Sequence, residues 1–183
     1  MNKYVIILGL FIYSMGHVHH SMALSASPSN AQLLDEYKPL GNGLMKVMFW
    51  EVYQAELYVQ KTPFKENIFP QALKITYLRD IDKDDLIEAT KDQWQHIGIS
   101  EPQQKKWLTA LVNVFPNIKE GEIITLVVDH LKQSSFYFTS DTVINQPLGE
   151  IKDIDFGPAF LAIWLSEKTS RPALRQQLLG NEK

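Results

Sequence analysis

Histidines are the side chains of this sequence whose spacing first suggests chemistry. His17, His19 and His20 stand close together near the start of the chain. Imidazoles at such short spacing are common zinc ligands. They fall, however, in a segment that we expect to be removed, so they predict no metal site in the mature protein. His96 and His130 lie far apart and lack partner ligands nearby, which favours ordinary histidines.

The pair Arg79-Asp80 has two interpretations. A guanidinium stays charged and offers a planar fork of donors, so Arg79 could meet an anionic group at the mouth of a pocket. Alternatively, the pair anchors a turn between a strand and a helix, with Asp80 or Asp82 capping the helix. We favour the structural interpretation.

Three tyrosines of the predicted strands, Tyr53, Tyr58 and Tyr77, could direct their hydroxyl groups into a pocket. Aromatic residues of strands more often belong simply to the core. Trp94, with Trp107 and Trp164, is expected to pack helices onto a sheet.

Motifs for covalent or phosphate chemistry are absent from the sequence. There is no Gly-x-Ser-x-Gly turn, no phosphate-binding glycine loop and no cysteine. Asp84 and Glu88 have the spacing of a helix surface. The net charge of −3, without a basic cluster, argues against a nucleic-acid surface. We therefore predict no catalytic residue, no metal and no cofactor.

The first 23 residues have the layout of a secretory signal peptide. A basic start precedes the uncharged run from Tyr4 to Met15, and small residues precede a cleavage point after Ala23. The run is shorter than the about 20 residues that span a bilayer, and an uncleaved anchor is the alternative. We predict a signal peptide over 1–23, a flexible lead over 24–39 and one domain over 40–183. The mature protein is expected in the periplasm or secreted, without an integral membrane segment.

The pattern of apolar residues predicts strands, two helices, strands and two more helices. Leu40-Gly41-Asn42-Gly43 is expected to form a turn, and Ser100 with Gln103 a capping box. Asp155 is expected to cap a helix, and Gly98 and Gly180 to end helices. The expected strands span 44–60, 72–78, 122–130, 134–140, 142–145 and 148–151, and the expected helices span 82–97, 100–115, 155–165 and 171–179.

This order favours an α+β fold, in which an antiparallel sheet carries helices packed on one face. A regular alternation of strand and helix, which would indicate a parallel doubly wound sheet, is missing.

Several segments together resemble the bacterial exported branch of the chalcone isomerase-like family. They are Gly41-Asn42-Gly43, Glu51 to Val59, Ile75 to Ile81, Lys119-Glu120-Gly121-Glu122, Phe160 to Leu165, and Leu178-Leu179-Gly180. The resemblance implies an open-faced β-sandwich with a pocket between sheet and helices. In the plant enzymes that pocket closes a flavanone ring, and in related non-catalytic members it holds a fatty acid.

The resemblance also implies an arginine on the first long strand, which meets an anionic oxygen. Its place here falls on Met45, and the next residue is Lys46, which points to the opposite face of a strand. The family's functional tyrosine and asparagine have no counterpart between Asp82 and Asp92. Losing one positioned donor typically lowers a rate by about 10² to 10³.

We therefore predict a non-catalytic exported protein that binds a fatty acid or another small apolar ligand, and the sequence does not identify a protein partner. The candidate pocket residues are Met45, Lys46, Tyr53, Tyr77, Arg79 and Trp94. Two alternatives remain open: an isomerase or lyase acting through Arg79, Lys46 and Tyr77, and an envelope scaffold with a collapsed pocket.

Overall fold

The computed structural model describes residues 33–181 of the chain. The expected signal peptide, its cleavage point and the three histidines within it lie outside the described residues, as does most of the expected lead. The end of that lead belongs to the fold, because the first strand already begins at Lys38. Within the described part, no helix combines the length and apolar character needed to cross a bilayer.

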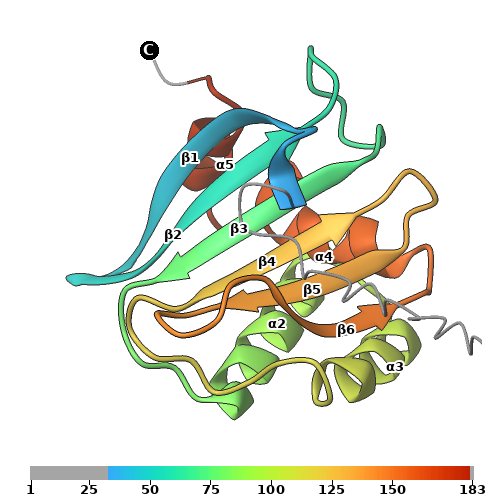
Figure 1. Ribbon diagram of the computed structural model, residues 1–183. Helices are drawn as coiled ribbons and strands as arrows, with labels where there is room; N and C mark the ends of the chain where they lie inside the picture. Colours follow the sequence, from blue (N-terminus) through green and yellow to red (C-terminus); the bar gives the residue numbers. More distant parts are fainter. Residues whose placement is uncertain (1–32, 182–183) are drawn as a thin grey trace, which may run out of the picture.

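Six antiparallel strands form one sheet in which every strand pairs with its neighbour in sequence (Figure 1). The strands are β1 (Lys38–Val47), β2 (Trp50–Val59), β3 (Gln71–Tyr77), β4 (Ile123–Val128), β5 (Ser134–Thr139) and β6 (Gln146–Ile151). Strands β3 and β4 are rich in apolar residues on the helix-facing side, as the strand periodicity predicts.

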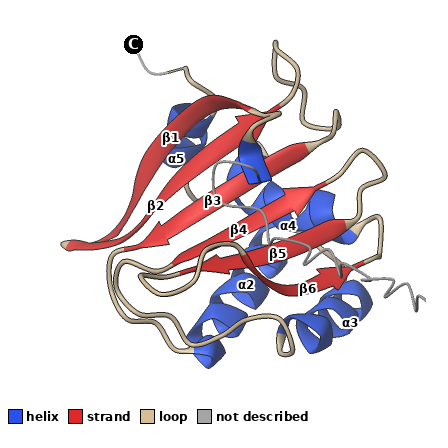
Figure 2. Ribbon diagram, in the orientation of Figure 1, coloured by secondary structure: helices blue, strands red, loops and turns tan. Residues whose placement is uncertain are grey.

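Helices α2 to α5 cover one face of this sheet (Figure 2). They are α2 (Lys83–Ile97), α3 (Glu101–Leu111), α4 (Phe156–Leu165) and α5 (Pro172–Leu178). Gly98 and Gly180 follow helix ends with φ angles of 90° and 70°, as predicted. The α+β class with helices on one face of an antiparallel sheet is thereby confirmed.

The expected turn at residues 40–43 is wrong, because these residues lie inside β1. The turn is at Met48 and Phe49, and Met48 has a φ angle of 54°. The glycines serve close packing instead: a Cβ on Gly41 would lie 2.7 Å from the Leu178 carbonyl oxygen of α5. A Cβ on Gly43 would likewise press into the side chains of α5. The expected single strand 44–60 is therefore two strands of a hairpin.

Three smaller expectations also fail. Residues 142–145 form no strand, because Asn145 has a φ angle of 51° and its N–H donates to the Thr139 hydroxyl. The capping box is not formed: the Ser100 hydroxyl donates to Oε1 of Gln103 at 2.6 Å, and no side chain caps the helix. Asp155 precedes α4, but its side chain makes no capping hydrogen bond.

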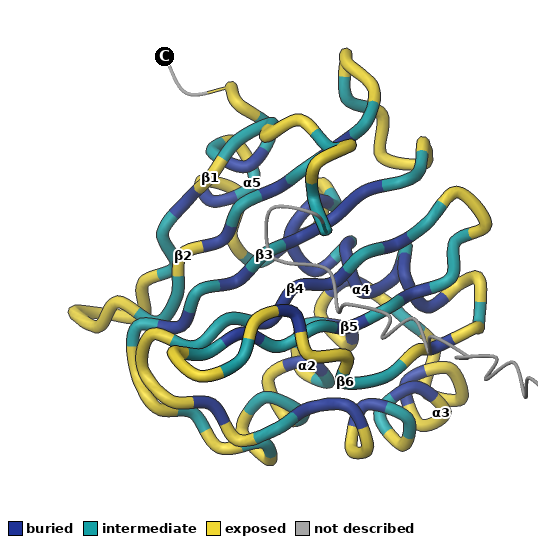
Figure 3. Tube along the Cα trace, viewed as in Figure 1, coloured by how far each residue is buried: buried dark blue, intermediate teal, exposed yellow. Residues whose placement is uncertain are grey.

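An aromatic cluster fills the core between the helices and strands β4 to β6. Trp94, Trp107, Phe136 and Phe156 are almost completely buried and meet mostly edge to face. The Trp94 indole N–H donates to the Ala159 carbonyl over 3.0 Å, which ties α2 to α4. Figure 3 shows this burial along α4 and the central strands.

Candidate functional site

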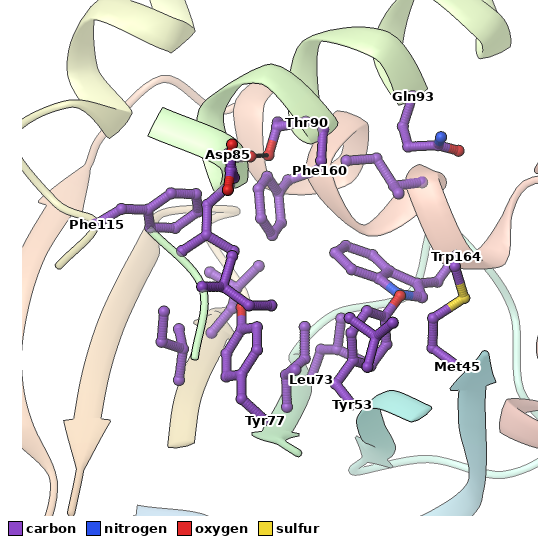
Figure 4. A pocket seen from close by; sticks show the side chains of 18 of the residues that line it. Met45, Tyr53, Leu73, Tyr77, Asp85, Thr90, Gln93, Phe115, Phe160 and Trp164 are labelled. Atoms are coloured by element: carbon purple, nitrogen blue, oxygen red, sulfur yellow. Dashed lines mark hydrogen bonds between the residues drawn. The ribbon is translucent and has the colours of Figure 1, made fainter. Parts of the chain in front are cut away.

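A cavity of about 380 Å³ lies between the sheet and the helices, beside the aromatic cluster (Figure 4). That volume falls within the range of ligand-binding pockets. Its floor comes from β1 to β5, and its roof from α2, α4 and the segment that precedes α5. The pocket is open, so a scaffold with a collapsed pocket does not describe this structure.

The register of the sheet gives the cavity an inner and an outer end. Strands β3 and β4 bring Leu73 opposite Leu126, and Phe136 of β5 lies opposite Leu126 in turn. This apolar row is the inner end. Tyr77 and Tyr53, which pair across β3 and β2, lie four residues further along β3, toward the β1–β2 turn. An apolar chain would therefore fit inward, with its polar end at the tyrosines.

The two tyrosines supply neutral hydroxyl groups within apolar surroundings. Their rings meet edge to face with centroids 6.1 Å apart. The Tyr53 hydroxyl accepts a hydrogen bond from the indole N–H of Trp164 over 2.8 Å. The Tyr77 hydroxyl points into the cavity, and it has no hydrogen-bond partner among residues 33–181 (Figure 4). It can therefore donate to a bound ligand.

Burial keeps both hydroxyl groups protonated. It raises the pKa of Tyr53 to about 12, although the Trp164 hydrogen bond and the positive charge of Arg171 act in the opposite direction. Burial, together with the neighbouring Tyr53, also raises the pKa of Tyr77 well above its ordinary value. At neutral pH both groups are therefore hydrogen-bond donors that carry no charge.

Arg171 contributes a cation to the outer end of the cavity. Its position follows from how α5 lies on β1: Leu174 and Gln177 face Gly43, and Arg171 precedes Leu174 by about one turn. Its backbone N–H donates to the Thr169 hydroxyl over 3.2 Å. Sequence reasoning assigned this arginine only to a helix start, because nothing in the sequence shows that α5 packs on β1.

Acidic residues of α2 also border the opening. Asp85 and Asp92 are exposed and line the cavity, and Gln93 accepts a hydrogen bond from the Ser170 hydroxyl over 2.6 Å. At the Tyr53 hydroxyl, however, the charge that affects the pKa is that of Arg171. The positive charge of Arg171 therefore favours an anionic group at this tyrosine, whereas desolvation by burial, which is the larger effect, disfavours one.

Three of the six predicted pocket residues, Met45, Tyr53 and Tyr77, meet at the cavity. Met45 lies on β1 opposite Tyr53 and extends its thioether toward Trp164 (Figure 4). No cation occupies its position, and the arginine implied by the family resemblance is therefore missing from β1. The neighbouring Arg171 brings a guanidinium to the cavity from another element.

The other three predicted residues do not line the cavity. Lys46 lies on β1 with its ammonium 2.7 Å from Glu51. Arg79 holds its guanidinium 5.4 Å from the centre of the Trp50 ring. Trp94 is enclosed in the aromatic cluster. An isomerase acting jointly through Arg79, Lys46 and Tyr77 thus has no geometric basis here.

The remaining chemical candidates also have ordinary surroundings. Asp80 accepts hydrogen bonds from the Lys119 ammonium and the Glu120 N–H, and Asp82 makes no side-chain cap. Across residues 33–181 there is no group of three or more histidine, cysteine or acidic side chains arranged to hold a metal ion.

The fold and cavity define an open-faced antiparallel sheet whose helical layer encloses a mainly apolar pocket. A family model described as "Chalcone isomerase-like" matches residues 29–180, so the chain belongs to the chalcone isomerase-like family. No curated protein matches the sequence.

Among solved structures, the chain is similar to the crystal structure of a fatty-acid binding protein of Arabidopsis thaliana. The TM-score is 0.60 at 14% sequence identity, and the match covers 80% of this chain and 88% of that one. At this identity the likeness shows the shared fold.

Proposed function

We propose that this protein is an exported, non-catalytic carrier of a fatty acid or an amphipathic ligand of similar shape. The observation that carries the proposal is the cavity itself, which combines an apolar inner end with two neutral tyrosine hydroxyls and Arg171 at its outer end. The family membership and the fatty-acid binding protein of similar fold support it. Export rests on the signal-peptide layout of residues 1–23.

The geometry suggests one orientation for the ligand. The acyl chain would lie along Leu73 and Leu126, where burial of each CH₂ group contributes about 0.8 kcal/mol. The carboxylate would face Arg171 and accept a hydrogen bond from the Tyr77 hydroxyl. Hydrogen bonds to a charged group are stronger than those between neutral groups, so this end sets the orientation.

The absence of a cation at Met45 supports carriage over catalysis. A charged side chain fixed on the sheet floor would stabilise a developing oxyanion from within the pocket. Arg171 instead is exposed at the opening, where water shares its interaction with the ligand. That arrangement suits reversible binding of an anion.

The decisive experiment is native mass spectrometry of the protein purified under mild conditions, before and after incubation with hexadecanoic acid. We expect an adduct of one fatty acid per chain. A fluorescent probe, cis-parinaric acid, measures the affinity and is displaced by hexadecanoic acid. A protein that carries no lipid and takes up neither compound would overturn the proposal.

A further inference from the structure

The turn between β1 and β2 carries a continuous run of exposed apolar side chains. We call Val47, Met48, Phe49 and Trp50 the hairpin tip. Phe49 is 92% exposed, Met48 85% and Trp50 65%. Other exposed large apolar residues, such as Leu131 and Ile144, stand singly in other loops. A run of this kind on a soluble surface marks an interaction site.

The hairpin tip projects from the molecule. Figure 1 shows the β1–β2 turn extending beyond the other elements, and Figure 3 shows that this end of the hairpin is exposed. A pointed projection offers no broad flat surface, whereas a stable protein interface buries about 1,200–2,000 Å² in total. The shape of the hairpin tip therefore suits insertion into a lipid bilayer better than docking against a second copy of the chain.

Charges beside the hairpin tip match the surface of a bilayer. The Arg79 guanidinium stacks on the Trp50 ring at 5.4 Å and forms no ion pair within residues 33–181. Lys46 adds an ammonium, which Glu51 partly neutralises. Tryptophan with a neighbouring cation is typical of the membrane–water interface, where the ring lies among head groups and the cation meets phosphates.

The hairpin tip is also continuous with the cavity. Val47 belongs both to the tip and to the cavity lining, and Val52 and Met45 continue that lining along the two strands. The outer end of the cavity, with Tyr53 and Tyr77, lies at this same end of the sheet. A bilayer in contact with the tip would therefore lie next to the cavity opening.

We propose that the hairpin tip docks the protein on a lipid bilayer by inserting Met48, Phe49 and Trp50 among the acyl chains, with Arg79 at the anionic head groups. This contact goes beyond the proposed carrier function and can be measured in the absence of any free ligand. It is a peripheral contact of a hairpin, distinct from a membrane-spanning segment.

Vesicle flotation tests the contact. The full chain is expressed, purified and mixed with vesicles of phosphatidylcholine and phosphatidylglycerol. The intact mass of the purified protein is recorded, because it shows at which residue the chain begins. We expect F49S and M48S together to weaken binding by about tenfold or more, because two apolar side chains lose their burial. L131S and I144S, which remove exposed apolar groups elsewhere, are the matched controls and should bind like the wild type.

A spectroscopic measurement assigns any binding to the hairpin tip. Trp50 is exposed whereas Trp94, Trp107 and Trp164 are buried. Lipids with brominated acyl chains should quench the wild-type fluorescence, and W50F should lose that quenching while it keeps its fold. R79Q should reduce binding to anionic vesicles and leave binding to pure phosphatidylcholine unchanged.

Three results would overturn the proposal. They are a wild-type protein that does not float with vesicles, equal flotation of the tip and control variants, and a concentration-dependent dimer that F49S abolishes. Binding of cis-parinaric acid in solution without vesicles is measured in parallel. A failure of membrane docking is thereby distinguished from a failure of the carrier function.

Discussion

Trp164 of α4 donates its indole N–H to the hydroxyl of Tyr53 on β2 over 2.8 Å. This hydrogen bond joins the helical layer to the sheet across the wall of the cavity. It leaves the Tyr53 hydrogen free to donate, since the tyrosine oxygen is the acceptor. This one hydrogen bond thus closes the cavity wall between α4 and β2, and it leaves the Tyr53 O–H able to donate to a group inside the cavity.

Breaking that contact should reduce stability. W164F removes the donor, and Y53F leaves the indole N–H without its acceptor. We expect a coupling free energy of about 1 kcal/mol between the two substitutions, as for a partly buried hydrogen bond. Urea denaturation of both single variants and the double variant measures it. Additive losses in the double variant would show that the two side chains do not stabilise one another.

Arg171 should select ligands by charge. We expect R171Q to weaken binding of hexadecanoic acid by about tenfold, because an exposed charge-assisted contact is lost. Hexadecanol has no carboxylate and should bind the variant within about twofold of the wild type. R171K should retain part of the preference for the acid, and K168Q, at an exposed neighbouring position, serves as the control. Equal losses for acid and alcohol would place the cation away from the ligand's polar end.

Asp153 should make the fold sensitive to acid. Hydrogen bonds from the Lys106 ammonium at 2.6 Å and the Trp107 indole at 2.8 Å lower the pKa of this carboxyl to about 2. In the unfolded chain its pKa is about 3.9, so the folded state favours the ionised form. The resulting stabilisation is complete above about pH 4 and is lost as the pH falls through 2.

Urea midpoints measured between pH 5 and 2 check this expectation. D153N should lower the midpoint at pH 5 and show a shallower decline on acidification. D141N, in an exposed loop, should follow the wild-type profile. A D153N profile parallel to that of the wild type would exclude the carboxylate as the source of the acid sensitivity.

The contact between β1 and α5 should not tolerate a methyl group. The Cβ of G41A would lie 2.7 Å from the Leu178 carbonyl oxygen, and backbone atoms cannot rotate away as a flexible side chain can. We expect a loss of about 1–3 kcal/mol, typical of overpacking. N42A changes the exposed residue next to it and should cost less than 0.5 kcal/mol. Thermal denaturation compares the two, and equal melting temperatures would contradict the tight packing.

Periodicity in the sequence was sufficient to predict most helices and strands, because their buried residues recur at the spacing of the element. Strand β3 and helix α2 are examples. The glycines at 41 and 43 were misread, since the same residue type permits a turn and a close approach. Only the fold shows that α5 lies on these glycines.

The site was harder to predict than the fold. Tyr53 and Tyr77, two of the candidate pocket residues, do line the cavity, and alternation along each strand turns both toward its helix-covered side. Arg171 was missed because it is distant in sequence from Met45 and reaches the cavity through the packing of α5 on β1. Arg79 is near the site in sequence, yet its side chain turns to Trp50.

The packing of α5 on β1 also has a consequence for the order of folding. During synthesis β1 emerges long before α5, so this strand of a nascent chain has no helix to cover it. The sheet can grow strand by strand from local hairpins, because every strand pairs with its neighbour in sequence. On a chain that folds while it is synthesised, the cavity wall beside β1 would therefore be completed last, and its apolar residues would stay exposed until α5 has been made.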